Sequence, residues 1–297
     1  MAYRFRGKDR SVELAVRRIA REQVDGAIAA IAAKQPALAV HEVRRCCKKV
    51  RALVRLVRPG LECARHENES FRQIAALLSG SRDAKVLLDT FDLLVADAPD
   101  ELDQGSLETA RRHLSDHRDH AASATGADLL DEARVRLGTA VVRIENWAIA
   151  GDGKGDGWQA LEGGLLRIYR QGREDARALD ASAPAEAWHD LRKQVKYHWY
   201  HTRLLQPVWP GPMRQREGQL GRLGEALGQH HDICVFAAHV GSHPDTVGAA
   251  GEALLVLANA RRAQIEEEAL PQLQRLYAQS PKALGQYWRK LWRIWRG

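Results

Sequence analysis

The sequence contains an internal repeat, and this repeat constrains the fold more than any other feature. Identical residues recur at a constant offset of 148. The matched pairs are Pro36 and Pro184, His41 and His189, Arg44 and Arg192, Lys48 and Lys196, Arg55 and Arg203, Leu56 and Leu204, and Pro59 and Pro207. Chance scatters matches over many offsets, so a run at one offset indicates two copies of one unit. We therefore expect two halves, residues 1–150 and 151–297, that pack about a pseudo-twofold axis.

The segment between the two copies is typical of a linker. Residues 151–157 read Gly-Asp-Gly-Lys-Gly-Asp-Gly and lie at the midpoint of the chain. Glycine loses much backbone entropy on ordering and supplies no side chain for a core. This segment is therefore the predicted boundary between the halves.

Both halves have the composition and punctuation of helical proteins. Good helix formers dominate, and no stretch alternates Val, Ile and Thr as a strand would. The ten prolines are expected to separate helical segments. Helices are predicted over residues 9–34, 37–58, 66–97, 105–123, 126–149, 157–180, 184–206, 212–240, 245–279 and 283–295, with a break at 79–81. The expected fold is all-α, with two halves that each resemble a four-helix bundle.

Composition restricts the partners and the compartment. Lys and Arg number 45 against 38 Asp and Glu, and the excess favours an acidic partner such as nucleic acid, a phosphorylated polymer or an anionic membrane. No apolar run approaches the roughly 20 residues of a transmembrane helix, and no secretory signal is visible. The four cysteines form no C-x-x-C pair, which argues against a disulfide framework or a zinc ribbon. We expect a reduced, cytoplasmic protein.

One helix in each half carries the densest positive charge. At about 100° per residue, one face of the first helix holds His41, Arg44, Arg45, Lys48, Arg51, Arg55 and Arg58. The second copy holds His189, Arg192, Lys193, Lys196 and Arg203 on the corresponding face. A solvated helix face usually mixes charge signs to gain i,i+4 pairs, whereas these like charges stand one turn apart and repel. They predict an external anion, because Arg forks phosphate oxygens and Lys adds a compact charge.

The helix that precedes each basic helix adds further cations. These residues are Arg17, Arg18 and Arg21 in the first half, and Arg167, Tyr169, Arg170 and Arg173 in the second. Two basic helices side by side would line a groove, and low-dielectric walls would focus its positive potential. We therefore expect a central basic groove.

The motif H-[DE]-h-R-[RK]-x-x-K, at residues 41–48 and again at 189–196, resembles that of the CHAD domain, the conserved-histidine α-helical domain. Arg82-Asp83 and His231-Asp232 support the resemblance, which spans about residues 5–290. It implies two pseudo-symmetric helical bundles that bind inorganic polyphosphate in a central basic groove, without catalysis or a cofactor. The implied ligand residues on the motif are His41, Arg44, Arg45, Lys48, Arg51, Arg55, His189, Arg192, Lys193, Lys196 and Arg203, and Arg82 joins them as a candidate.

The second copy departs from this pattern at two positions. Trp199 stands where the first copy has Arg51, so one cation is lost, and we expect this second face to bind the anion less tightly. His231 stands where the first copy has Arg82, and a histidine is charged only part of the time near neutral pH.

Histidine clusters leave a metal site or a metal-dependent phosphohydrolase as the alternative. His113, His117 and His120 have ligand spacing on one helix, with Asp116 and Asp119 nearby. His198 and His201 form another pair, but His198 falls on the core side of its helix. The sequence His230-His231-Asp232 contains the HD dipeptide of phosphohydrolases, yet the repeat aligns His231-Asp232 with Arg82-Asp83, which is not metal-binding. A binding protein with no bound metal is the favoured interpretation.

Nucleic acid and membrane are the remaining candidate partners. No aromatic residue alternates with the cations as base stacking requires, and a narrow groove suits a thin polyanion better than a duplex. Trp288, Trp292 and Trp295 form a stripe that is typical of a membrane-surface helix or of a last helix docked on the core, and docking is favoured. We expect polyphosphate as the partner, no sequence-specific nucleic acid and no stable membrane insertion. Polyphosphate granules and their proteins remain open as a location and as partners.

Overall fold

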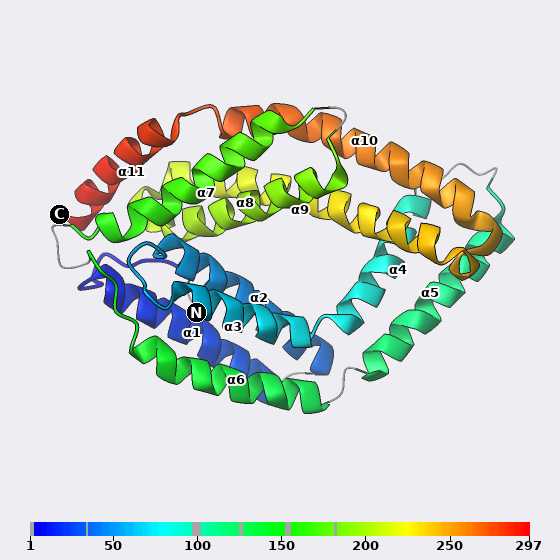
Figure 1. Cartoon of the computed structure of the whole chain (residues 1–297), viewed down its shortest axis with the longest axis horizontal. Coiled ribbons are helices and arrows are strands. Elements are labelled where there is room, and N and C mark those ends of the chain that lie inside the picture. Colours follow the sequence, from blue (N-terminus) through cyan, green and yellow to red (C-terminus); the bar gives the residue numbers. More distant parts are fainter. Residues whose placement is uncertain (1–2, 34, 97–101, 125–126, 152–155, 181–182) are drawn as a thin grey trace.

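The computed structural model describes residues 3–33, 35–96, 102–124, 127–151, 156–180 and 183–297, and these ranges are helical without a strand (Figure 1). The helices are α1 (Val12–Ala33), α2 (Pro36–Leu56), α3 (Ala64–Leu77), α4 (Gly80–Ala96), α5 (Gln104–Ala124), α6 (Ala127–Glu145), α7 (Gln159–Ala178), α8 (Ala185–Leu204), α9 (Pro210–Ser242), α10 (Gly251–Leu276) and α11 (Pro281–Arg296). The all-α prediction is confirmed. Residues 152–155 of the predicted linker lie outside the described ranges.

Prolines begin several helices, as predicted, but one does not. Pro36, Pro210 and Pro281 occupy the first turns of α2, α9 and α11, where a backbone N–H has no partner to lose. Pro271 was expected to separate helices and instead lies inside α10. The buried residues on either side, Ala269 and Leu273, hold this helix on the core. Packing here outweighs the cost of about 3 kcal/mol for an internal proline.

The predicted break between α3 and α4 is present, and the second half has no equivalent. Helix α3 ends at Leu77, and the hydroxyl of Ser79 donates a hydrogen bond of 2.8 Å to the carbonyl of Ala76. In the second half, α9 runs without interruption over most of the positions that match both α3 and α4. This long helix therefore joins two parts of the molecule that the first half builds from separate helices.

The buried side chains form two hydrophobic cores, and each core draws on both halves of the sequence. The first core lies between α1, α2, α3, α6, α7, α8 and α11 and takes in parts of α9 and α10. The second core joins α4 and α5 to the far parts of α9 and α10, with Phe91 and Phe236 among its buried residues. Figure 1 shows this second group of helices at the right of the molecule.

The tryptophan stripe of α11 docks on the first core. Trp288 and Trp292 are buried, and Trp295 packs partly buried beside them. The indole N–H of Trp292 donates to the carbonyl of Asp156 at 2.8 Å, and its ring meets Phe5 edge-on. The predicted docking is confirmed, and the membrane-surface interpretation of this stripe is wrong. No helix within the described ranges is long and apolar enough to span a bilayer.

Helix α7 approaches the backbone of α2 at a glycine. A Cβ atom on Gly164 would lie 1.9 Å from the carbonyl oxygen of Leu56 and 2.4 Å from that of Arg55. Both distances are far below van der Waals contact, so only glycine fits. This contact places α7 against the end of the basic helix α2.

Candidate functional site

The two basic helices, α2 and α8, contact each other directly. The Nε2 atom of His201 on α8 lies 2.9 Å from the carbonyl oxygen of Ala52 on α2. His201 is buried, and burial lowers its pKa to about 4, so the neutral ring donates this hydrogen bond. The contact fixes where the two helices cross. We call the side chains that they carry the basic cluster: His41, Arg44, Arg45, Lys48, Arg51, Arg55, His189, Arg192, Lys193, Lys196 and Arg203.

A matching arginine of each basic helix lies near the matching position on the other helix. The guanidinium of Arg55 on α2 lies 4.4 Å from the ring centroid of Tyr197 on α8. On the other side of the crossing, Arg203 of α8 lies near Lys49 of α2. Burial and the charges of Arg45 and Arg203 lower the pKa of Lys49 to about 8. Tyr197 matches Lys49, and Arg203 matches Arg55, at the offset of 148.

Glycines of α9 make room for the basic side chains of α8. A Cβ on Gly224 would lie 3.1 Å from the Cε atom of Lys196, and one on Gly221 would lie 3.4 Å from the indole nitrogen of Trp199. Burial, followed by the charge of Arg192, lowers the pKa of Lys196. Lys196 and Trp199 therefore pack against α9 rather than extending into solvent.

Trp199 contacts two cations at the position where the sequence predicted weaker binding of the anion. Its ring centroid lies 5.4 Å from the guanidinium of Arg203 and 5.7 Å from the ammonium of Lys196. An aromatic face attracts cations within about 6 Å. Trp199 thus orients two members of the basic cluster although it carries no charge itself.

The polar face of α2 mixes exposed cations with cations that also support the fold. His41, Arg45 and Lys48 are exposed. Arg44 donates to the carbonyls of Ala75 and Leu78 at 2.8 and 3.1 Å, which satisfies the open end of α3. Arg51 donates to the side chain of Asn68 at 3.3 Å. Arg44 is therefore a structural residue as well as a candidate ligand.

Local carboxylates cannot neutralise these helices. Residues 41–58 contain seven Lys and Arg against one carboxylate, that of Glu42, and residues 189–203 contain four against one, that of Asp190. Glu42 pairs with Arg45, and Asp190 pairs with Lys193 at 2.7 Å, while Glu217 of α9 lies 3.7 Å from Arg203. Exposed pairs of this kind contribute about 0–1 kcal/mol each. Within these two segments the cations therefore outnumber the carboxylates by eleven to two.

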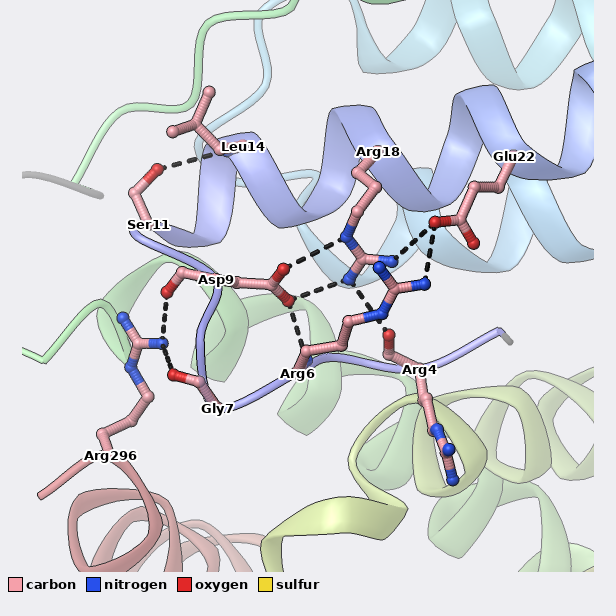
Figure 2. Close-up of polar contacts among 9 residues, drawn as sticks. All are labelled: Arg4, Arg6, Gly7, Asp9, Ser11, Leu14, Arg18, Glu22 and Arg296. Carbon is pink, nitrogen blue, oxygen red and sulfur yellow. Dashed lines mark hydrogen bonds and ion pairs between the residues drawn. The ribbon is translucent and has the colours of Figure 1, made fainter. Parts of the chain in front are cut away.

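Arg18 of α1 pairs with carboxylates of the N-terminal segment and of its own helix rather than with α2. Figure 2 shows its guanidinium between Asp9, at 2.8 Å, and Glu22, at 3.2 Å. Arg6 shares the carboxylate of Glu22, and Arg296 of α11 donates to the carbonyl of Asp9 at 2.6 Å. This network ties both ends of the chain to α1.

Arg17 and Arg21 face α6. Arg17 donates to the carbonyl of Trp147 at 2.6 Å and pairs with Glu13, while Arg21 pairs with Glu145. The structure does not bring the three α1 arginines into the basic cluster. Some of their partners, such as Glu13 and Glu22, lie one turn away on α1, and others, such as Glu145, lie far away in the sequence.

The α7 residues divide into two groups. Tyr169 is buried and its hydroxyl donates to the carbonyl of Gln279 at 3.0 Å, and Arg173 donates to the carbonyl of Tyr277 at 3.0 Å. These two residues hold the segment after α10. Their partners give them a structural role.

Arg167 and Arg170, the other two α7 candidates, are exposed. Desolvation and the nearby charge of Arg167 lower the pKa of Arg58, so Arg167 stands close to the cations at the end of α2. The side chain of Arg82, another candidate ligand, lies outside the described residues.

The rings of two histidines, one on each of α8 and α9, lie against each other beside the basic cluster. The ring centroids of His189 on α8 and His231 on α9 are 4.2 Å apart. Burial, His189 and Arg192 lower the pKa of His231 to about 4. Burial and the charges of Lys193 and Arg192 also lower the pKa of His189. Burial among cations therefore favours the neutral ring of His231.

The remaining histidines occupy structural positions or form no metal shell. His198 is buried and accepts a hydrogen bond of 3.1 Å from Arg216, so its predicted core position is confirmed. His230 contacts Glu266 at 2.7 Å. Among the residues that the structure describes, no group of three or more His, Cys, Asp or Glu side chains is arranged to hold a metal ion. The cluster His113, His117 and His120 gains no support as a metal site.

The fold and the basic cluster define an all-helical protein built around two crossing basic helices. The sequence matches the family model of the CHAD domain over residues 15–241, and the chain belongs to the CHAD domain family. The predicted resemblance is confirmed.

Two solved structures share this fold. The CHAD domain from the plant Ricinus communis is 15% identical, with 89% of each chain covered and a TM-score of 0.59. PptA from Streptomyces chartreusis is also 15% identical, with 89% of this chain and 98% of that chain covered and a TM-score of 0.63. None of the curated proteins matches the sequence significantly.

Proposed function

We propose that this protein binds inorganic polyphosphate on its basic cluster and leaves the polymer chemically unchanged. The observation that carries the proposal is the direct contact between two like-charged helices, at the hydrogen bond between His201 and Ala52. Membership of the CHAD domain family, which is known to bind polyphosphate, supports the same ligand.

The electrostatics of the cluster favour a polyanion over a single small anion. Neighbouring guanidinium groups help to lower the pKa of both Lys49 and Lys196, so the cations repel one another in the protein as it stands. A polymer with one charge per phosphate can neutralise many of these cations at once. Arg forks the phosphate oxygens, and Lys supplies a point charge.

Each half of the sequence would contribute one helix to a shared groove. The reciprocal contacts of Arg55 with Tyr197 and of Arg203 near Lys49 support a two-fold relation at the crossing. A flexible chain of phosphates would run along both helices. Because one long polymer can bind many copies of the protein, the protein would also associate with polyphosphate granules in the cytoplasm.

The salt dependence of binding tests this proposal. Affinity for long-chain polyphosphate should fall steeply as salt rises from about 50 to 200 mM, because each neutralised phosphate releases a counterion. Duplex DNA of equal total charge should bind more weakly at every salt concentration. Titration calorimetry measures both affinities. Phosphate analysis of the product, in the presence of Mg²⁺ or Mn²⁺, measures whether the polymer is cleaved.

Three outcomes would contradict the proposal. A flat salt response would exclude a polyanion on the cluster, and equal binding of DNA would indicate a nonspecific basic surface. Release of orthophosphate that disappears on changing His231 and Asp232 would establish the metal-dependent phosphohydrolase instead.

The stacked histidines predict a pH effect with a definite sign. The pKa values of His189 and His231 in the folded protein lie below the ordinary 6.5. Between about pH 6.5 and 4 the unfolded chain binds protons that the native protein does not, so the free energy of unfolding should fall as pH falls. A bound polyanion stabilises the imidazolium form and should raise these pKa values.

We therefore expect polyphosphate binding to take up protons near pH 6 and to strengthen as pH decreases from 7 to about 5.5. Calorimetry at pH 6 in buffers of different ionisation enthalpy measures the proton uptake. His231→Gln should remove most of it while the protein still binds. An uptake that is unchanged in this variant would show that other groups titrate.

A further inference from the structure

A cavity lies on the other side of α9 from the glycines that receive α8. Helices α9, α10 and α11 enclose about 320 Å³ there, and an adjoining hollow of about 610 Å³ continues between α9 and α10. The two spaces share the lining residues Arg216, Gln219, Arg275 and Leu276. Their volumes fall in the range of small-molecule sites, about 300–1,000 Å³. None of the lining residues belongs to the basic cluster.

A partly buried arginine without an acidic partner lies at the inner side of this cavity. Arg216 donates through Nε to His198 and through Nη2 to the carbonyl of Leu276, at 3.1 and 3.2 Å. Its guanidinium also lies 5.9 Å from the ring centroids of Tyr169 and Trp288. No Asp or Glu of the described residues forms an ion pair with it. Burial lowers the pKa of this guanidinium, which shows that its charge is poorly solvated.

The lining adds cations and amides around Arg216. Arg275 of α10 and Arg222 of α9 are exposed at the adjoining hollow, and both lack an ion pair within the described residues. The amides of Gln219 and Gln272 lie beside them. Because these groups supply positive charge and hydrogen-bond donors with no carboxylate, an anion of more than one charge fits this end of the cavity.

The outer end of the cavity is aromatic. Trp209, before α9, and Tyr287, on α11, are each 43% exposed, and their ring centroids are 6.3 Å apart. Pro212 and Leu291 complete this apolar part of the lining. Large exposed aromatic rings at the mouth of a cavity offer a stacking surface for a planar group.

We propose that this cavity is a second binding site, for a small anion of the nucleoside phosphate class. The phosphate groups would contact Arg216, Arg275 and Arg222, and the planar base would lie against Trp209 and Tyr287. Inorganic polyphosphate lacks a planar group, so the aromatic end distinguishes this site from the basic cluster.

Calorimetry with ATP, adenosine and inorganic tripolyphosphate at matched ionic strength tests the proposal on the full-length protein. At this cavity ATP should bind more tightly than either of the other two, because only ATP uses both ends. Loss of the Trp209 ring should therefore weaken ATP and leave tripolyphosphate, which can also bind the basic cluster, unchanged. Trp209→Ala and Arg275→Gln should each weaken ATP binding by about tenfold, the loss expected for one stacking or charged contact. Both residues are exposed, so both variants should fold.

The controls separate this site from the proposed function. Arg261→Gln removes a partly exposed charge elsewhere on α10 and should leave ATP binding unchanged. Arg275→Gln should leave polyphosphate binding within about twofold of wild type. The proposal fails if Trp209→Ala weakens tripolyphosphate as much as ATP, if Arg261→Gln weakens ATP as much as Arg275→Gln does, or if ATP binding is lost on changing Lys48 and Arg55. The last result would place ATP on the basic cluster and leave the polyphosphate proposal standing.

Discussion

Replacing Lys48, Arg51 and Arg55 of α2 together with glutamine should weaken polyphosphate binding about a thousandfold. A hydrogen bond to a charged group contributes about 1.5 kcal/mol or more, roughly tenfold in affinity for each contact. Glutamine keeps most of the side-chain stem and removes the charge. Binding at one fixed salt concentration measures the loss.

The matching change on α8, which is Arg192, Lys196 and Arg203 to glutamine, should cost a similar factor. The sequence alone suggested a smaller loss on this helix, but Trp199 holds both Lys196 and Arg203 in place. Thermal unfolding should show both triple variants folded. Arg44 is left intact, because it donates to two carbonyls at the end of α3 and its loss would disturb the fold as well.

The matched control removes three charges outside the basic cluster. Arg111 on α5 and Arg134 on α6 are exposed, Arg136 on α6 is partly exposed, and each pairs with a carboxylate. Their change to glutamine alters the net charge by the same amount and should leave affinity within about threefold, because only long-range screening changes. If this control loses as much affinity as the cluster variants, binding is diffuse and the site assignment is wrong.

Substituting alanine for Gly164 should destabilise the protein by about 3 kcal/mol or more. Overpacking a core by a methyl group costs about 1–3 kcal/mol, and the new Cβ would meet rigid backbone rather than a side chain that can move. It would lie 1.9 Å from the carbonyl of Leu56, so α7 must shift away from α2. Urea unfolding measures the free energy of unfolding directly.

Gly138→Ala in α6 is the matched control. A Cβ there has no atom within 4 Å, so the change should stabilise the protein by up to about 1 kcal/mol through helix propensity. Equal stability of the Gly164→Ala and Gly138→Ala variants would show that α7 and α2 are not packed as described.

Local periodicity predicted the helices and the faces of α2 correctly. Val43, Cys46, Val50 and Leu53, which lie opposite the cations in the sequence pattern, are all buried. The same pattern placed His198 and Trp292 on core faces, and both are buried. These predictions succeed because a helix repeats every 3.6 residues, so neighbours along the chain decide which side chains share a face.

Periodicity failed where a partner lay far away in the sequence. Arg21 shares a turn pattern with the cluster cations, yet it pairs with Glu145 of α6. Lys49 follows Lys48 in the sequence, yet it is buried and donates to Gln23 of α1 at 2.7 Å. Which carboxylate or amide meets a cation depends on how whole helices pack, and sequence spacing does not encode that distance.

The sequence by itself determined that the chain is helical, that it carries two copies of one basic motif, and that one helix in each half has a face dense in positive charge. Only the tertiary structure decided that the α1 arginines lie apart from the basic cluster, because Asp9, Glu145 and the carbonyl of Trp147 come to them from other segments and carboxylates of α1 itself complete their pairing. It also decided that α4 and α5 share a core with α9 and α10, since these contacts join residues more than 100 positions apart. Burial and long-range packing, rather than local pattern, lower the pKa of His231 and place Trp199 against two cations.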